Sequence, residues 1–214
     1  MISLGLDPSL TGFGWCVHDA SAIGPSKIVA RGHQSTSPRD IFVTRYMSLR
    51  DFISRVLLEH SRIENVGVES PPYGELWSEG LYGLFLYVNE ALFKAKKDVV
   101  FFDPLTLKLL VKQDATVIKG ILRKSDMVAA ARASTGIKGP FNHNEADAYH
   151  IAYFAARFWQ LYGGEIKEDN LTPSERHVFL RTHTYKRGEK AGQTTRSGLM
   201  FRESNRFFRF SRFE

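Results

Sequence analysis

The sequence predicts an α/β fold with one mixed five-stranded sheet and helices on both of its faces. Three short apolar segments follow one another near the N-terminus, and their connections are too short for a crossover, so these strands must be antiparallel. Helical and extended segments then alternate, which favours parallel strands joined by right-handed crossovers. The run Val-Val-Phe-Phe at residues 99–102 is apolar enough for a strand that is buried on both faces.

The expected strands are short and are separated by turn residues. They span residues 2–6, 13–18, 27–32, 65–69 and 98–103. Pro8, Gly12 and Gly14 mark the first turn, and residues 21–26 form the second. The first three strands form the antiparallel part of the sheet, and the last two are the parallel additions.

The expected helices follow apolar residues at helical spacing. They span residues 41–60, 80–96, 104–111, 125–135 and 144–162. Pro38 and Asp40 precede the first of them, and Ser125 is a suitable N-cap for the fourth. The last helix is rich in alanine and aromatic residues, which is typical of a helix packed against a sheet.

Residues 163–214 differ in composition from the rest of the chain. They hold 11 Lys and Arg against 7 Asp and Glu, and they end in Arg206-Phe-Phe-Arg-Phe-Ser-Arg-Phe. No strong helical period is visible there; residues 177–184 alternate as a strand would, and residues 188–197 resemble a mobile loop. We therefore expect one domain at residues 1–162 and a basic, aromatic extension at 163–214, which either binds DNA or docks on the domain.

Composition limits the class of protein. Hydrophobic residues make up 43% and charged residues 24% of the chain, as in soluble globular proteins. No apolar run reaches the roughly 20 residues that span a membrane, and the N-terminus lacks the pattern of a secretory signal. Cys16 is the only cysteine, and its apolar neighbours indicate a buried strand residue. We expect a protein of a reducing, cytoplasmic compartment.

The net charge of +6 suggests a polyanionic partner. Residues 94–138 concentrate this charge, with ten Lys and Arg against four Asp. A well-solvated surface is the alternative interpretation of the same residues.

Three acids stand where a metal site could form. Asp7 and Glu69 each end a strand, and Asp147 lies in the first turns of the last helix. Ligands of open α/β sheets gather beyond the carboxyl ends of the strands, so Asp7 and Glu69 would face each other if their strands are neighbours. Taken singly, the three could be a turn-capping residue, a surface acid and a helix-dipole partner.

Carboxylates held this close repel one another unless a cation lies between them. Hard cations such as Mg²⁺, or Mn²⁺ in its place, prefer oxygen ligands. Two such ions about 3.5–4 Å apart can activate a water molecule and stabilise the leaving oxygen of a phosphodiester. With basic residues around the acids, a phosphoester is the substrate that fits this arrangement.

Four segments resemble motifs of the RuvC-like Holliday-junction resolvases. The first is Gly5-Leu-Asp-Pro-Ser-Leu-Thr-Gly-Phe-Gly-Trp, and the second is Val-Gly-Val-Glu69-Ser-Pro. Pro104, Lys108, Val111, Gly120, Lys124 and Met127 are similar to the segment before the last helix of that family, and Asn144-Glu-Ala-Asp-Ala is similar to its final motif. The resemblance covers about residues 1–160.

The resemblance implies an RNase H-like fold, a homodimer and paired nicks that resolve four-way DNA junctions. It implies that Asp7, Glu69 and Asp147 are catalytic residues and metal ligands, with two ions in each active site. A fourth ligand of the family stands three residues before the last acid, where this chain has Asn144. His143 lies on the same helical face as Asp147 and is the alternative fourth ligand.

The basic stretch of the chain fits DNA contacts as well. The basic residues expected to follow the phosphates are Lys108, Lys112, Lys119, Arg123 and Lys124. Lys124 should lie nearest the active site, and Tyr73 could stack on an unpaired base. The helix at residues 80–96 has a broad apolar face, which is either core or part of the dimer interface.

Two other functions remain open at this stage. The same fold could process RNA or RNA–DNA hybrids, and cleavage of a panel of substrates would distinguish this. The chain could also be a non-catalytic protein that binds branched DNA, although three uncompensated acids would weaken its hold on phosphates.

Overall fold

We describe a computed structural model of the chain, in which all residues are described except 72–77, 113–121, 185–191, 197–198, 205–208 and 211–214. Its central sheet has the strand order β3-β2-β1-β4-β5-β8-β9 across the described residues. These strands are β1 (Ile2–Asp7), β2 (Phe13–Asp19), β3 (Ile28–Gln34), β4 (Asn65–Glu69), β5 (Asp98–Phe102), β8 (Met200–Arg202) and β9 (Arg209–Phe210).

The five strands predicted from the sequence are confirmed in position and direction. The β1–β2 and β2–β3 pairs are antiparallel, whereas β1–β4 and β4–β5 are parallel. The predicted total of five is too low, because β8 pairs antiparallel with the edge of β5, and β9 then pairs with β8. A strand of three residues has too little pattern to be recognised, since its stability comes from the partner strand.

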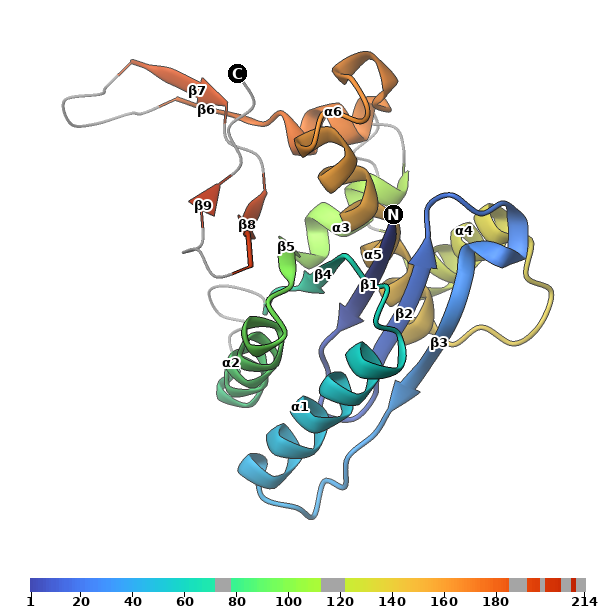
Figure 1. Cartoon of the computed structure of the whole chain (residues 1–214), viewed down its shortest axis with the longest axis vertical. Coiled ribbons are helices and arrows are strands. Elements are labelled where there is room, and N and C mark those ends of the chain that lie inside the picture. The colour runs from blue at the N-terminus through green and yellow to red at the C-terminus, as the bar shows by residue number, and fades with distance from the viewer. Residues whose placement is uncertain (72–77, 113–121, 185–191, 197–198, 205–208, 211–214) are drawn as a thin grey trace.

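Helices cover both faces of the sheet (Figure 1). The helices are α1 (Phe42–Glu59), α2 (Glu79–Lys94), α3 (Pro104–Lys112), α4 (Lys124–Thr135), α5 (His143–Tyr162) and α6 (Pro173–Phe179), with 3₁₀ turns at η1 (Gly24–Lys27) and η3 (Glu168–Asn170). One hydrophobic core joins α1 and α2 to the sheet, and a second joins α5 to α3 and α6. The predicted N-cap Ser125 is wrong: α4 begins one residue earlier, with Arg123 as its N-cap.

Alternation along β1 and β4 sends large and small residues to opposite faces. Leu4, Leu6, Val66 and Val68 are fully or almost fully buried in the core with α1 and α2. The intervening glycines face α5, where a Cβ atom at Gly5 would overlap the backbone of that helix. Because these positions lack side chains, α5 packs directly on the strand ends that carry the acids.

The C-terminal segment is more regular than the sequence pattern suggests. The expected strand at residues 177–184 is wrong in its first part, because α6 extends to Phe179 and only β6 (Thr182–Thr184) is extended. Thr172 and Glu175 form a capping box, and Pro173 takes the first helical position, so the local signal for this helix was present in the sequence. β6 pairs with β7 (Thr194–Arg196) in a separate two-stranded sheet.

Among the described residues, no helix combines the length and hydropathy that crossing a membrane requires.

Candidate active site

The parallel pairing of β1 with β4 brings the first two acids together. Gly5 pairs with Gly67 and Leu6 with Val68, so the next residues, Asp7 and Glu69, stand side by side at the carboxyl ends of both strands. The predicted site requires that these two strands be neighbours, and the structure shows that they are. Asp147 comes to the same place from the second turn of α5, which packs on β1 and β4.

The three carboxylates line one cavity of about 240 Å³. Its walls are formed by Asp7, Ser9, Glu69, Pro104, Leu107, Lys108, Lys124, Met127, Asn144 and Asp147. The acids come from β1, β4 and α5, and the two lysines come from the facing helices α3 and α4. The cavity therefore combines a cluster of negative groups with a cationic rim, which suits a phosphate ester bound next to a cation.

All three acids hold their protons more tightly than ordinary carboxylic acids do. Burial, followed by the charges of Asp7 and Asp147, raises the pKa of Glu69 to about 9. Burial and the charge of Asp147 raise the pKa of Asp7 to about 7, and burial raises that of Asp147 to about 6. Lys124 opposes the last two shifts and Lys108 opposes those of Glu69 and Asp147, so the lysines only partly offset burial and repulsion.

The oxygen donors present fit a hard divalent cation. One side-chain oxygen of Asp147, Oδ1, is buried and has no hydrogen-bond partner among the described residues, and such an orphaned acceptor calls for a ligand. Within the described part of the chain, no three His, Cys, Asp or Glu side chains already close into a compact metal cluster. Asp7, Glu69 and Asp147 instead line the cavity of about 240 Å³, and Mg²⁺ in proteins usually keeps several water ligands.

Gly12, in the β1–β2 connection, and Gly14, in β2, leave space for Asn144 beside this cavity. A Cβ atom at Gly12 would overlap the side-chain nitrogen of Asn144, and one at Gly14 would overlap its backbone oxygen. The hydroxyl of Ser9 accepts hydrogen bonds from the backbone N–H groups of Thr11 and Gly12, at 3.3 Å each, and so shapes the turn.

The connection is also held from the opposite face of the sheet by α1. The guanidinium of Arg45, which is 6% exposed, donates to the backbone oxygen of Leu10 at 3.0 Å and to the hydroxyl of Thr36 at 2.8 Å. Thr36 itself donates to the same oxygen at 2.6 Å. These contacts fix the residues that follow Asp7 in the chain.

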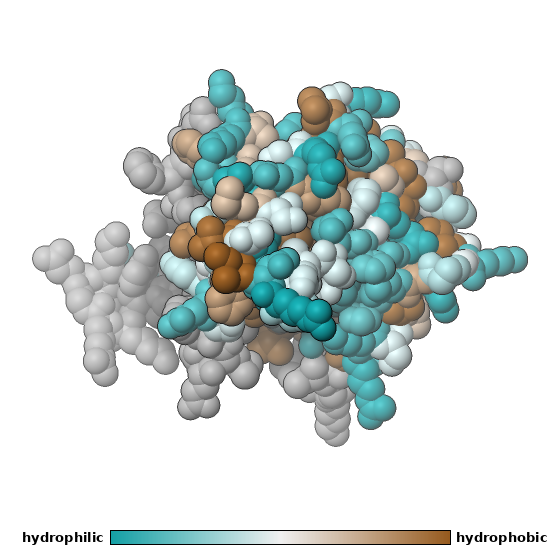
Figure 2. Space-filling view, turned by 90° about the horizontal axis from the view of Figure 1, so that it is seen from below, coloured by the Kyte–Doolittle hydropathy of each residue, from teal (hydrophilic) through white to brown (hydrophobic). Residues whose placement is uncertain are grey.

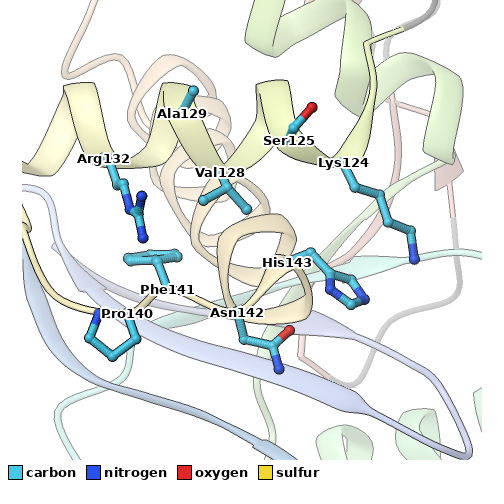
Figure 3. Close-up of a pocket in the computed structure, with 9 residues that line it drawn as sticks. All are labelled: Lys124, Ser125, Val128, Ala129, Arg132, Pro140, Phe141, Asn142 and His143. Atoms are coloured by element: carbon cyan, nitrogen blue, oxygen red, sulfur yellow. The ribbon is translucent and has the colours of Figure 1, made fainter.

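The alternative fourth ligand, His143, lines a different hollow next to the cavity (Figure 3). Asn144 lines the cavity itself, whereas His143 is not among the residues that do. Burial, the charge of Lys124 and that of His33 lower the pKa of His143. Of the two candidates left open by the sequence, the placement favours Asn144.

Two polar neighbours in α5 have structural partners. Glu145 forms ion pairs with Arg31 and, at 3.5 Å, with His33. His150 is buried with Nε2 2.9 Å from the backbone oxygen of Met127, and burial lowers its pKa to about 4. His150 thus joins α5 to α4 beside the cavity.

The predicted DNA contacts are only partly placed at the cavity. Lys108 and Lys124 line it. Lys112 ends α3 and Arg123 caps α4, and neither is among the described residues that line the cavity. Two others, Tyr73 and Lys119, lie outside the described residues.

Sequence reasoning missed four lining residues: Ser9, Pro104, Leu107 and Met127. Ser9 belongs to the turn after Asp7, so its place in the motif was the available signal. Pro104 and Met127 belong to the segment that resembles the family before its last helix, so their places in that motif were also an available signal. Leu107 had none, because only the packing of α3 against the strand ends puts it there.

No protein-family model matches the chain, and a search of curated proteins finds no match either. Solved structures do match. Thermus thermophilus RuvC is 22% identical with a TM-score of 0.62, and the match covers 76% of this chain and 97% of that one. T. thermophilus RuvC in complex with a Holliday junction substrate is 23% identical with a TM-score of 0.59, over 75% and 96% of the two chains.

A third match is the yeast mitochondrial Holliday junction resolvase Ydc2, which is 13% identical with a TM-score of 0.49, over 74% and 78% of the two chains. At these identities the likeness to RuvC establishes the fold. The chain therefore has the RNase H-like fold of RuvC, as its motifs predict.

Proposed function

We propose that this protein is a structure-selective endonuclease that resolves four-way and other branched DNA by paired, metal-dependent hydrolysis of phosphodiester bonds. One observation carries the proposal: Asp7, Glu69 and Asp147 come from three separate elements and line a single cavity together with Lys108 and Lys124. The RuvC fold supports the choice of substrate, because one of the matching structures is a complex with a Holliday junction.

The residues that would hold Mg²⁺ are Asp7, Glu69 and Asp147, with the side-chain oxygen of Asn144 as the fourth donor. A bound divalent cation supplies an activated water molecule and neutralises negative charge at the reacting phosphate. Asp7 would be shared by both ions of a two-metal site, because its strand β1 pairs with β4, which carries Glu69, and packs against α5, which carries Asp147. Isothermal titration with Mg²⁺ in the presence of uncleavable junction DNA should give two ions per protomer.

The two lysines would act on the substrate. Lys108 and Lys124 lie opposite the acids and lower their pKa values, so both ammonium groups are close enough to act on charges inside the cavity. Each would attract the phosphate and neutralise part of its charge, and each neutralised phosphate contributes about 0.9 to the log–log salt slope of binding. Their placement supports a phosphodiester substrate over an uncharged one.

Two nicks in opposing strands need two active sites, so the proposal includes a homodimer. Exposed apolar residues support it: Tyr82, Leu86 and Phe93 form a stripe along α2, each about half exposed. The start of α1, at the lower end of the molecule in Figure 1, adds exposed Phe42 and Val43. Figure 2 looks at that end and shows a hydrophobic patch among hydrophilic residues.

The proposal places the nuclease domain at residues 1–162 and treats 163–214 as an extension of it. β8 from this extension pairs with β5, so the extension contributes to the sheet while the acids lie on other elements.

The test is cleavage of a labelled four-way junction with and without Mg²⁺, next to flaps, RNA–DNA hybrid and linear duplex. We expect symmetric nicks in two opposing strands that depend on the metal. Asp7→Asn, Glu69→Gln and Asp147→Asn should bind the junction and leave it uncut, whereas Asp51→Asn, an exposed acid on α1, should cut normally. Preferred cleavage of the hybrid would favour RNA processing instead, and binding without any cleavage would indicate a non-catalytic protein.

A further inference from the structure

A second hollow of about 640 Å³ lies next to the cavity that holds the acids (Figure 3). It lies between α4 and the loop that leads into α5. Its lining includes Lys124, Ser125, Val128, Arg132, Phe141 and His143. The hollow has no part in the chemistry described above.

The hollow and the cavity adjoin each other. Lys124 lines both of them. His143 lines the hollow, and the next residue, Asn144, lines the cavity. A chain of linked phosphates with one group at the carboxylates would therefore continue into the hollow without leaving the protein surface.

The hollow is cationic. Its described lining includes two cations, Lys124 and Arg132, and no acid. In the part of the chain that the structure describes, no ion pair involves Lys124, Arg132 or His143. Of the acids on α4 and α5, Asp126 accepts the backbone N–H of Arg123 at 2.8 Å and Glu145 pairs with Arg31, whereas Asp147 lines the adjoining cavity together with Lys124.

The wall of the hollow is held in place before anything binds. Arg31 donates to the backbone oxygen of Pro140 at 2.9 Å, and its guanidinium lies over the ring of Phe141, 4.2 Å from the centroid. Because Arg31 covers the Phe141 ring and the ring is buried, its face is not a platform for a base. Arg132 and Lys124, by contrast, are both exposed among the residues that line the hollow (Figure 3).

We propose that this hollow binds the sugar–phosphate backbone of the cleaved strand and holds the phosphate next to the scissile one, with Arg132 as its main cation. The inference rests on the proposed function, since it assumes that a nucleic acid strand enters the carboxylate cavity. Backbone contacts of this kind fix the position of the strand and are independent of base sequence. Arg132 is thus a positioning residue, and Lys124 is shared by two consecutive phosphates.

The first test compares Arg132→Gln with Arg55→Gln, an exposed arginine on α1 at the opposite face of the sheet. Junction affinity is measured across a range of salt concentrations. Losing one phosphate contact should lower the log–log salt slope of Arg132→Gln by about 0.9 and weaken binding about fivefold at low salt, whereas Arg55→Gln should match the wild type. The dependence of cleavage on Mg²⁺ concentration should be unchanged at saturating DNA. A slope equal to that of Arg55→Gln would overturn the proposal.

The second test locates the contact. Neutral methylphosphonates replace single phosphates on both sides of the cut site, one position at a time. One substitution directly next to the scissile phosphate should weaken binding of the wild type and have no further effect on Arg132→Gln. If the sensitive position lies several nucleotides away, or if wild type and variant respond alike everywhere, the hollow does not hold the neighbouring phosphate.

The two proposals fail separately in these experiments. If the protein cleaves junctions in a metal-dependent way and Arg132→Gln binds DNA like the wild type, the nuclease function is supported and the phosphate site in the hollow is refuted. If Arg132→Gln has a reduced salt slope of DNA binding but the wild type cleaves no substrate, the hollow is supported as a nucleic-acid site and the nuclease function is refuted.

Discussion

Gly5 of β1 lies directly against the carbonyl oxygen of Ala148 in α5, so closely that a Cβ atom at residue 5 would overlap that oxygen. The same atom would be 2.5 Å from the backbone nitrogen of Ala152. Backbone atoms cannot rotate away as a flexible side chain can, so this contact fixes the distance between β1 and α5. Asp7 follows Gly5 by two residues and Asp147 precedes Ala148, and the contact thereby sets how far apart the two acids lie.

We predict that Gly5→Ala lowers both stability and cleavage. Overpacking a filled core costs about 1–3 kcal/mol, and the upper end is expected because the obstacle is backbone. Urea denaturation measures the loss, and junction cleavage under saturating Mg²⁺ measures the displacement of α5. Gly139→Ala is the control, because a Cβ atom there would have nothing within 4 Å. Equal stability of the two variants would contradict the close contact.

A second prediction separates the two candidates for the fourth metal ligand. Asn144→Ala should weaken Mg²⁺ binding, whereas His143→Ala should leave the metal affinity unchanged and weaken junction binding, because His143 lines the neighbouring hollow. Asn144→Asp keeps an oxygen donor and adds charge, so it should bind Mg²⁺ at least as tightly as the wild type. Calorimetric titration of the three variants with Mg²⁺ measures these affinities. If only His143→Ala loses metal binding, His143 and not Asn144 is the fourth ligand.

The third prediction concerns pH and metal binding. Burial raises the pKa of Asp147 to about 6, and burial together with repulsion between the acids raises the pKa values of Asp7 and Glu69 to about 7 and 9, so protons occupy the site near neutral pH. Mg²⁺ has to displace these protons, and its apparent affinity should rise between pH 6 and 9, by about tenfold per pH unit for each proton released. Titrations in buffers of different ionisation enthalpy count the protons. An affinity that is flat across this range would show that the acids are already ionised.

The fourth prediction follows from the same pKa shift of Glu69 in the metal-free protein. Its pKa rises from 4.5 to about 9 on folding, so between these values the folded state binds more protons than the unfolded state. Stability is therefore fully present below pH 4.5 and is lost as the pH rises towards 9, by up to about 1.4 kcal/mol per pH unit. Glu69→Gln should remove this slope and melt at a higher temperature than the wild type at pH 8 in EDTA.

A fifth prediction concerns the ion pair that docks α6. Arg157 binds Glu175 through two hydrogen bonds, of 2.8 and 3.1 Å, and Glu175 is 1% exposed. Arg157→Met leaves that carboxylate buried without its cation, which costs about 3–5 kcal/mol. Proteolysis should then cut near α6 first. In Arg157→Met/Glu175→Gln no buried charge remains, and much of the stability should return; a double variant as weak as the single one would contradict this account.

The sequence predicted the acids well because they lie where local patterns are informative. Asp7 and Glu69 end short apolar strands, and the parallel pairing that follows from strand–helix–strand order puts them side by side. The sequence alone could not distinguish Asn144 from His143 as the fourth ligand. The two residues are adjacent on α5, and their side chains line two different hollows. That choice depends on Gly12, whose missing side chain leaves space for Asn144.

Other features were missed for different physical reasons. The segment Thr172-Pro-Ser-Glu175 contains the N-terminal capping pattern of α6. The helix is only seven residues long, so its apolar residues show no clear helical period. The strand β8 had no local signal, because three residues gain their extended form only by pairing with Val99 and Val100. The walls of the cavity, such as Leu107, arise from packing between elements that are distant in sequence.

The pairing of β8 with β5 also bears on how the protein stays in solution. β5 contains Val-Val-Phe-Phe, and without β8 its unpaired N–H and C=O groups would stand at the margin of the sheet beside four apolar residues. Such a strand is a template for intermolecular pairing and for aggregation. A chain shortened to residues 1–162 would lose this cover, and its precipitation could be mistaken for a loss of DNA affinity. Arginine-to-glutamine substitutions within the full-length tail keep the cover, and they are the sounder way to ask what its charges do.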